Sequence, residues 1–167
     1  MNATATHTPR FSDPTQLVPE LGDISVALFK LAANGEVPRG TVALMHLRAG
    51  QLVGNTYLTV LHTGNAQRAH VPEEKITAVA SWQDAPYFTD AERVALELVE
   101  AVLTLGRGGE RVPDELYARA AEHYNEAELA TLAMVIGQVT FFIPLAVIGK
   151  PLPGVRPSQQ WRADSAE

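Results

Sequence analysis

Apolar residues recur along most of the chain at intervals of three and four, which is the spacing of one face of an α-helix. The sequence lacks the sustained alternation of apolar and polar residues that is typical of half-buried strands. Helix-end signals separate the apolar stretches, with prolines suited to a first turn, N-capping residues and C-terminal glycines. The pattern therefore predicts an all-α fold, a single-domain helical bundle of about seven helices.

Two capping-box patterns mark helix starts most clearly, Thr89 with Glu92 and Asn125 with Glu128. The expected helices cover residues 23–33, 38–52, 55–69, 72–81, 89–105, 113–123 and 126–148. We expect Pro144 to kink the last of these helices, because proline lacks a backbone donor and its ring clashes with the preceding turn.

Proline-rich polar segments flank the helical part of the chain. They predict an N-terminal arm over residues 1–20, a helical domain over 21–150 and a C-terminal tail over 151–167. The glycine cluster at 106–109 lacks the Lys-Ser/Thr of a phosphate-binding loop, so we interpret it as a linker.

Length and charge narrow the class of protein. The 167 residues, 46% of them hydrophobic, suffice for one domain with a real core. The net charge of −6 and the scattering of its 13 Lys and Arg residues argue against nucleic-acid and anionic-membrane partners. No uninterrupted apolar stretch reaches the roughly 18 residues of a membrane span, and the first residues do not resemble a secretory signal. We expect a cytoplasmic protein.

The chain contains no cysteine, which excludes disulfides, thiolate metal sites and any mechanism with a thiolate nucleophile. The histidines also lack the spacing of a metal-binding motif. His46 and His62 fall on different expected helices, and His70 lies two turns beyond His62. We therefore expect neither a metal nor a cofactor.

A longer motif occupies residues 47–63, which read Leu-Arg-Ala-Gly-Gln-Leu-Val-Gly-Asn-Thr-Tyr-Leu-Thr-Val-Leu-His-Thr. It is followed in register by Trp82, Pro86 and the run Thr-Asp-Ala-Glu-Arg at 89–93. Over residues 20–150 the chain resembles the alkylhydroperoxidase-D-like branch of the carboxymuconolactone decarboxylase superfamily. The resemblance implies the all-helical alkylhydroperoxidase-D-like fold. It also relates the protein to peroxidases that reduce hydroperoxides with thiols.

The same resemblance indicates which chemistry is missing. Family members use two cysteines to reduce hydroperoxides, while a glutamate and a histidine relay protons. Asn55 and Leu58 stand at the cysteine positions, Ala43 stands near the glutamate position, and His62 stands at the histidine position. Both cysteines and the glutamate are therefore missing, and only the histidine is present. We expect a cysteine-less pseudoenzyme that acts as a non-redox binding or relic protein.

Each polar residue of this stretch has two interpretations. His62 is either a general acid/base for a lyase or isomerase, with Tyr57 orienting a carbonyl substrate, or a hydrogen-bonded residue at the core edge. Asn55 either lines a pocket or caps a helix, and its place after Gly54 at an expected helix start favours the cap. Leu58 at the second cysteine position can only pack.

The resemblance also bears on assembly, because members of the group commonly form trimers or hexamers. The strongly apolar last helix, 126–148, could bury a subunit face. Residues 140–144 read Thr-Phe-Phe-Ile-Pro where the family commonly has Asn-x-Trp-Asn-Arg. We expect the partners to be further copies of the chain and a small-molecule ligand, with no nucleic acid and no membrane.

Overall fold

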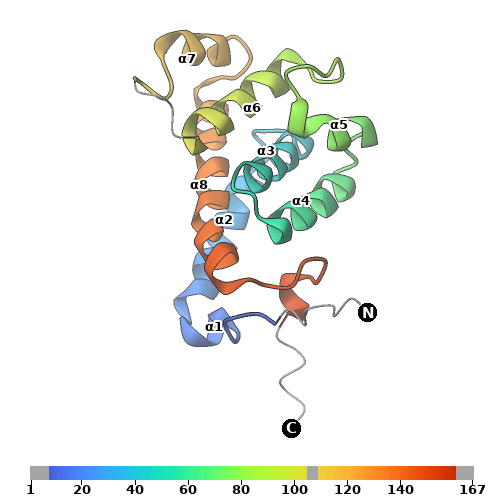
Figure 1. Ribbon diagram of the computed structural model, residues 1–167. Helices are drawn as coiled ribbons and strands as arrows, with labels where there is room; N and C mark the ends of the chain where they lie inside the picture. The colour runs from blue at the N-terminus through green and yellow to red at the C-terminus, as the bar shows by residue number, and fades with distance from the viewer. Residues whose placement is uncertain (1–7, 105–108, 161–167) are drawn as a thin grey trace, which may run out of the picture.

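The structure is a computed structural model of the chain, and it describes residues 8–104 and 109–160. In this part of the chain every regular element is a helix (Figure 1). The α-helices are α1 (Pro14–Leu17), α2 (Glu20–Ala32), α3 (Arg39–Leu52), α4 (Thr56–Arg68), α5 (Glu73–Ala78), α6 (Asp90–Leu103), α7 (Asp114–Ala121) and α8 (Glu126–Gly149), and the 3₁₀ helices are η1 (Val79–Ser81) and η2 (Pro157–Gln159). The predicted all-α fold is confirmed.

Both predicted capping boxes are present. The Thr89 hydroxyl accepts from the backbone N–H of Glu92 at 3.2 Å, and the Glu92 carboxylate accepts from the backbone N–H of Thr89 at 2.9 Å. Asn125 and Glu128 make the same reciprocal pair at the start of α8, at 3.0 and 2.7 Å. The two capping boxes therefore correctly predict where α6 and α8 begin. At its other end, α8 runs through Pro144 and ends only at Gly149.

The structure differs from the sequence-based prediction in several places, one of which is the 3₁₀ helix η2 inside the expected C-terminal tail. A short additional helix, α1, lies inside the expected N-terminal arm, where Asp13 caps it. The next helix, α2, begins at Glu20 rather than at residue 23, and this extra turn brings Leu21 into a buried position. The helix expected over residues 72–81 is divided into α5 and η1. Most of the expected linker at 106–109 lies outside the described residues.

The central helix is α3, which packs against α4, α6 and α8. Met45 and Ala49 belong to a buried cluster shared with α6, α7 and α8, whereas Leu44 and Leu47 belong to a second cluster with α5, η1 and α6. Because apolar residues are buried around it, α3 lacks the single polar face of a surface helix. Gly50 permits α4 to approach, since a Cβ there would lie 3.1 Å from the backbone of the facing turn of α4.

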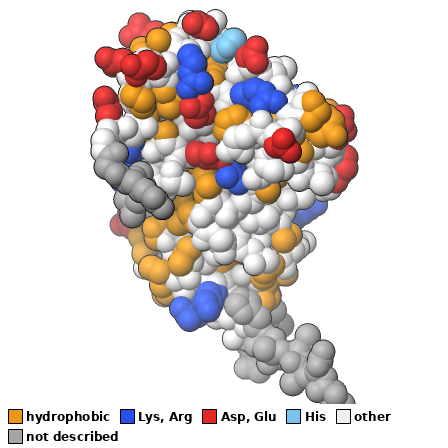
Figure 2. Space-filling view, turned by 45° about the horizontal axis from the view of Figure 1, so that its top comes forward, with side chains coloured by type: hydrophobic (Ala, Val, Ile, Leu, Met, Phe, Trp, Pro, Cys, Tyr) orange, Lys and Arg blue, Asp and Glu red, His pale blue; other side chains and the backbone are white. Residues whose placement is uncertain are grey.

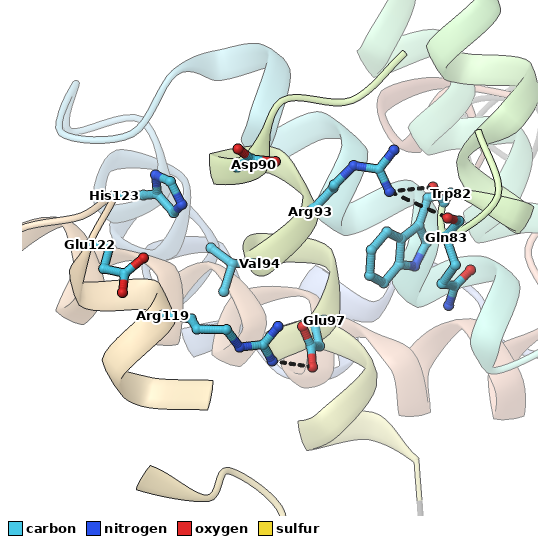
Figure 3. A pocket seen from close by; sticks show the side chains of 9 residues that line it. All are labelled: Trp82, Gln83, Asp90, Arg93, Val94, Glu97, Arg119, Glu122 and His123. Carbon is cyan, nitrogen blue, oxygen red and sulfur yellow. Dashed lines mark hydrogen bonds and ion pairs between the residues drawn. The ribbon is translucent and has the colours of Figure 1, made fainter. Parts of the chain in front are cut away.

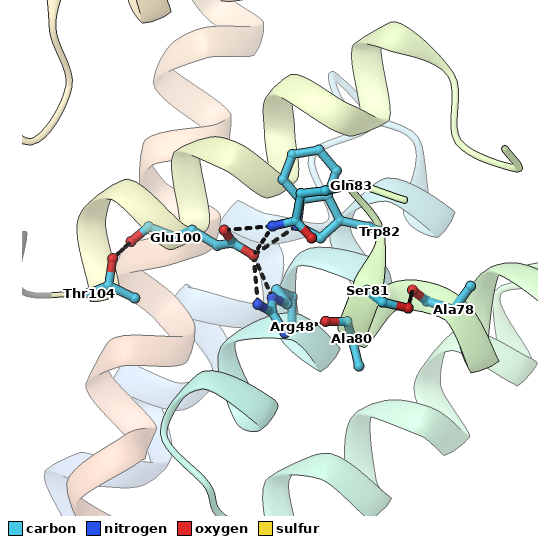
Figure 4. A network of polar contacts seen from close by, with 8 residues as sticks. All are labelled: Arg48, Ala78, Ala80, Ser81, Trp82, Gln83, Glu100 and Thr104. Atoms are coloured by element: carbon cyan, nitrogen blue, oxygen red, sulfur yellow. Dashed lines mark hydrogen bonds and ion pairs between the residues drawn. The ribbon is translucent and has the colours of Figure 1, made fainter. Parts of the chain in front are cut away.

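A polar network fixes η1 between α3 and α6 (Figure 4). Glu100 on α6 accepts hydrogen bonds from Arg48 Nε at 2.7 Å, from Trp82 Nε1 at 2.8 Å and from Gln83 Nε2 at 3.1 Å. Arg48 also donates to the carbonyl of Ala80 at 3.2 Å. One carboxylate therefore joins three elements that are distant in sequence.

The last helix, α8, runs along one side of the molecule with α2 beside it (Figure 1). By length and composition alone it could cross a membrane, as could the core helix of many water-soluble proteins. Its mean hydropathy reaches 2.1 over an 18-residue window, of which 39% is buried. In Figure 2, acidic and basic side chains lie intermixed over the upper half of the face shown, and many apolar side chains lie below them. Part of α8 is thus apolar and uncovered.

Candidate functional site

The two positions that correspond to family cysteines serve the fold of α4. Asn55 is its N-cap, and Asn55 Oδ1 accepts from the backbone N–H of Leu58 at 3.0 Å. Gly54, with a φ of +62°, supplies the left-handed turn that precedes this cap. The Leu58 side chain is 2% exposed and belongs to the interior. The cap interpretation of Asn55 is confirmed, and neither position offers a nucleophile.

His62 on α4 faces His46 on α3. Their ring centroids are 5.1 Å apart, the rings are tilted by 53°, and each residue is only 8% exposed. The sequence placed the two histidines on different helices and gave no reason to pair them. One signal was nevertheless present, because His46 follows Ala43, the empty glutamate position, by three residues and so shares its helix face. The structure therefore adds His46 to the candidate site as a neighbour of His62 that sequence reasoning missed.

Each ring has one defined hydrogen-bond partner. His46 Nε2 lies 3.1 Å from the carbonyl oxygen of Val135 on α8. A carbonyl only accepts, so this nitrogen carries the hydrogen and Nδ1 keeps the lone pair. His62 Nδ1 lies 3.2 Å from Asn65 Nδ2 on its own helix. One turn beyond Val135, the Oε1 atom of Gln138 is buried and has no hydrogen-bond partner among the described residues.

Burial keeps both rings neutral. Desolvation lowers the pKa of His46 to about 4, although its hydrogen bond to Val135 opposes the shift. Desolvation, together with the smaller effect of the neighbouring charge of a protonated His46, lowers the pKa of His62 to about 3. At neutral pH the pair is therefore uncharged, and the site disfavours any added charge.

Tyr57 is half-buried near the start of α4, and desolvation raises the pKa of its phenol. The phenol therefore keeps its proton at neutral pH. Among the hydrogen bonds of the described residues, none joins Tyr57 to His62. Within the described part of the chain, His, Cys, Asp and Glu side chains do not gather in threes as a metal site would require.

A separate open pocket of about 440 Å³ lies where η1, α6 and α7 meet (Figure 3). It is lined by Trp82, Gln83, Asp90, Arg93, Val94, Glu97, Arg119, Glu122 and His123. Its cations are already engaged, because Arg93 donates to the carbonyls of Trp82 and Gln83, and Arg119 pairs with Glu97 at 2.6 Å. The pocket contains none of the site residues predicted from sequence.

The arrangement of helices is an AhpD-like fold. The structure superposes with a TM-score of 0.79 on the crystal structure of an AhpD-named protein of unknown function from Agrobacterium tumefaciens. The two are 21% identical, and the match covers 89% of this chain and all of that chain. The debrominase Bmp8 matches with a TM-score of 0.74 at 21% identity, over 86% of this chain and 76% of its own. At this identity both comparisons show the fold.

Sequence comparisons then give the family. The model of the carboxymuconolactone decarboxylase family matches residues 19–101. The chain is also 30% identical over 124 residues to the uncharacterized protein YdfG of Bacillus subtilis, a match that covers 74% of this chain and 83% of that protein. The chain belongs to the carboxymuconolactone decarboxylase family, and the predicted resemblance is confirmed.

Proposed function

We propose that this family member has lost thiol-dependent hydroperoxide reduction and binds a small uncharged molecule beside His46 and His62. The observation that carries the proposal is a pair of neutral imidazoles 5.1 Å apart, next to cysteine positions that hold a helix cap and a core leucine. A site that lowers two histidine pKa values this far also disfavours an ionic ligand.

The redox part of the proposal follows from electron balance. Reducing a hydroperoxide to an alcohol and water takes two electrons, which a pair of thiols supplies as it becomes a disulfide. Asn55 and Leu58 cannot supply them, and the sequence contains no cysteine at any other position. The family's hydroperoxide chemistry therefore has no electron donor in this chain.

Two observations support a binding role. The unpartnered Oε1 of Gln138 lies one turn from the carbonyl that holds His46, and a buried acceptor left unpaired costs about 1–3 kcal/mol. A donor group on a ligand would satisfy it. The structural neighbour Bmp8 has also been crystallised as a cysteine-to-alanine variant in complex with 2,3,4-tribromopyrrole. That complex supports the idea that this fold holds a small ring after one of its cysteines has been replaced.

The test pairs each uncharged ring compound with a carboxylate of similar size, for example the lactam 2-piperidone, which has both a donor and an acceptor, with cyclohexanecarboxylate. Imidazole ¹⁵N NMR signals of His46 and His62 report binding, and the exposed His123 is the internal control. We expect uncharged compounds to shift the signals of the pair and carboxylates to leave them unchanged. Preferential binding of carboxylates, or steady reduction of tert-butyl hydroperoxide by a dithiol in the presence of the protein, would contradict the proposal.

A second candidate is a lyase or isomerase that uses His62. A pKa of about 3 makes the neutral ring a weak base at neutral pH, so we favour a role as hydrogen-bond donor to a substrate carbonyl over general base catalysis. The protonated Tyr57 phenol could provide a second donor. If His62→Ala leaves every activity in a lactone and hydroperoxide panel unchanged, this candidate is wrong.

We also propose that the protein associates with further copies of itself, as a trimer or hexamer. The support is an exposed apolar surface on neighbouring helices. On α2, Val26 and Phe29 are 54% and 59% exposed, and on α8 Met134 and Ile148 are 48% and 55% exposed. Helix α8 carries no charged residue between Glu128 and its C-terminal end, which suits burial against another subunit.

A further inference from the structure

Three polar side chains follow one another on α4 at intervals of three residues: His62, Asn65 and Arg68. Residues at this spacing are neighbours on a helix surface. A guanidinium nitrogen of Arg68 donates to Asn65 Oδ1, and Asn65 Nδ2 lies 3.2 Å from His62 Nδ1. Hydrogen bonds thus connect an exposed cation to a buried imidazole.

The chemistry of each group fixes the direction of each bond. The guanidinium of Arg68 carries only donors, so the atom of Asn65 that faces it is the carbonyl oxygen. The amide nitrogen of Asn65 then faces His62, and because this nitrogen only donates, His62 Nδ1 holds a lone pair. In a neutral imidazole the hydrogen is then on Nε2.

Gly64 makes room for this arrangement. A Cβ at this position would lie 3.4 Å from Arg68 Nη1 and 4.0 Å from Nη2, so the guanidinium lies over the glycine. A glycine inside a helix is less favourable than an alanine. A methyl group would make ordinary contact with the guanidinium, whereas a longer side chain would occupy its space.

We propose that Arg68 and Asn65 are positioning residues that hold His62 in the neutral tautomer with its hydrogen on Nε2. This inference rests on the proposed function and refines it, because it states what the site offers to a ligand. His62 presents a donor, so the ligand atom that meets it is an acceptor such as a carbonyl oxygen. His46, whose Nε2 donates to Val135, offers the lone pair of Nδ1. The ligand class is therefore an uncharged compound that carries both a carbonyl acceptor and a hydrogen-bond donor, as an amide or lactam does.

The test is imidazole ¹⁵N NMR of the full chain without ligand at neutral pH, which distinguishes a protonated nitrogen from one with a lone pair. In the unmodified protein we expect hydrogen on Nε2 of His62. Asn65→Asp should move it to Nδ1, because a carboxylate can only accept. Arg68→Met should give a mixture of tautomers, because the amide of Asn65 can then rotate. A wild-type hydrogen on Nδ1, or variant spectra identical to wild type, would overturn the proposal.

Matched variants on α4 separate positioning from general damage to the helix. Gly64→Leu should reproduce the effect of Arg68→Met by displacing the guanidinium, whereas Gly64→Ala and the exposed Gln67→Ala should leave the tautomer unchanged. If Asn65→Asp does not fold, the pair Gly64→Leu and Arg68→Met decides the question. A tautomer change of His62 in Gln67→Ala would count against a specific positioning role of Asn65 and Arg68.

The measurement also separates this inference from the proposed function. The spectra are recorded without ligand, so the predicted tautomer can be found even if no compound of the uncharged panel binds, and only the proposed function then fails. If the uncharged compounds bind but the hydrogen of His62 is on Nδ1, the positioning role of Asn65 and Arg68 is wrong and the proposed function still stands.

Discussion

The buried histidine pair should make the stability of the protein depend on pH in a specific window. An unfolded histidine has a pKa of about 6.5, whereas the folded values are about 4 for His46 and about 3 for His62. Below pH 6.5 the unfolded chain therefore binds protons that the folded chain does not bind. The free energy of unfolding therefore has its full value above pH 6.5 and decreases as the pH falls towards the folded pKa values.

The magnitude follows from these pKa values. One pKa unit corresponds to about 1.4 kcal/mol, and a histidine of the unfolded chain is already half protonated at pH 6.5. Lowering the pH from 6.5 to 5 should therefore remove roughly 3 kcal/mol for the pair, divided about equally between the two rings. Ordinary carboxylates titrate near pH 4, below most of this window. A loss of this size is a large fraction of the 5–15 kcal/mol that is typical of a folded domain.

Urea unfolding followed by far-UV circular dichroism at several pH values measures this loss. His62→Gln should reduce the pH-dependent loss by about half, because one of the two buried rings no longer takes up a proton on unfolding. His123→Gln, at an exposed position, should leave it unchanged. A free energy of unfolding that is constant within about 1 kcal/mol between pH 6.5 and 5 would show that the two rings are not held in their neutral form by burial.

Three further predictions concern the fold and the assembly. Glu100→Ala should lower the free energy of unfolding by about 2–3 kcal/mol, because Trp82 Nε1 and a guanidinium lose their acceptor; Glu97→Ala, in an exposed ion pair, should have a far smaller effect in the same urea titration. Asn55→Ala should cost about 1 kcal/mol through loss of the α4 cap, and an unchanged unfolding midpoint would contradict that role. Light scattering at micromolar concentration should give an oligomeric mass that Phe29→Glu reduces, whereas a monomeric wild type would sink the assembly proposal.

The helix starts could be predicted because their signals are local. A capping box such as Thr89 with Glu92 needs only residues of its own turn, and Asn55 after Gly54 is a cap for the same reason. The start of α2 was predicted too late because its extra turn buries Leu21, and this gain depends on tertiary packing that the local pattern does not encode.

The candidate site could be predicted only in part. The match between residues 47–63 and the family motif pointed to His62. Its contact with His46, in contrast, depends on how closely α3 and α4 approach at Gly50. That distance is a property of helix packing and not of residue spacing. The spacing of Asn65 and Arg68 after His62 was visible, but the orientation of the amide follows only from its contact with the guanidinium.

If His46 and His62 form one uncharged site, titration of their imidazole NMR signals should find both rings without charge at neutral pH. We expect both rings to stay neutral through the physiological range and to take up protons with midpoints of about 4 and about 3. Midpoints near 6.5, the value of a hydrated histidine, would show that the pair charges readily. The basis for a site that selects uncharged ligands would then be lost.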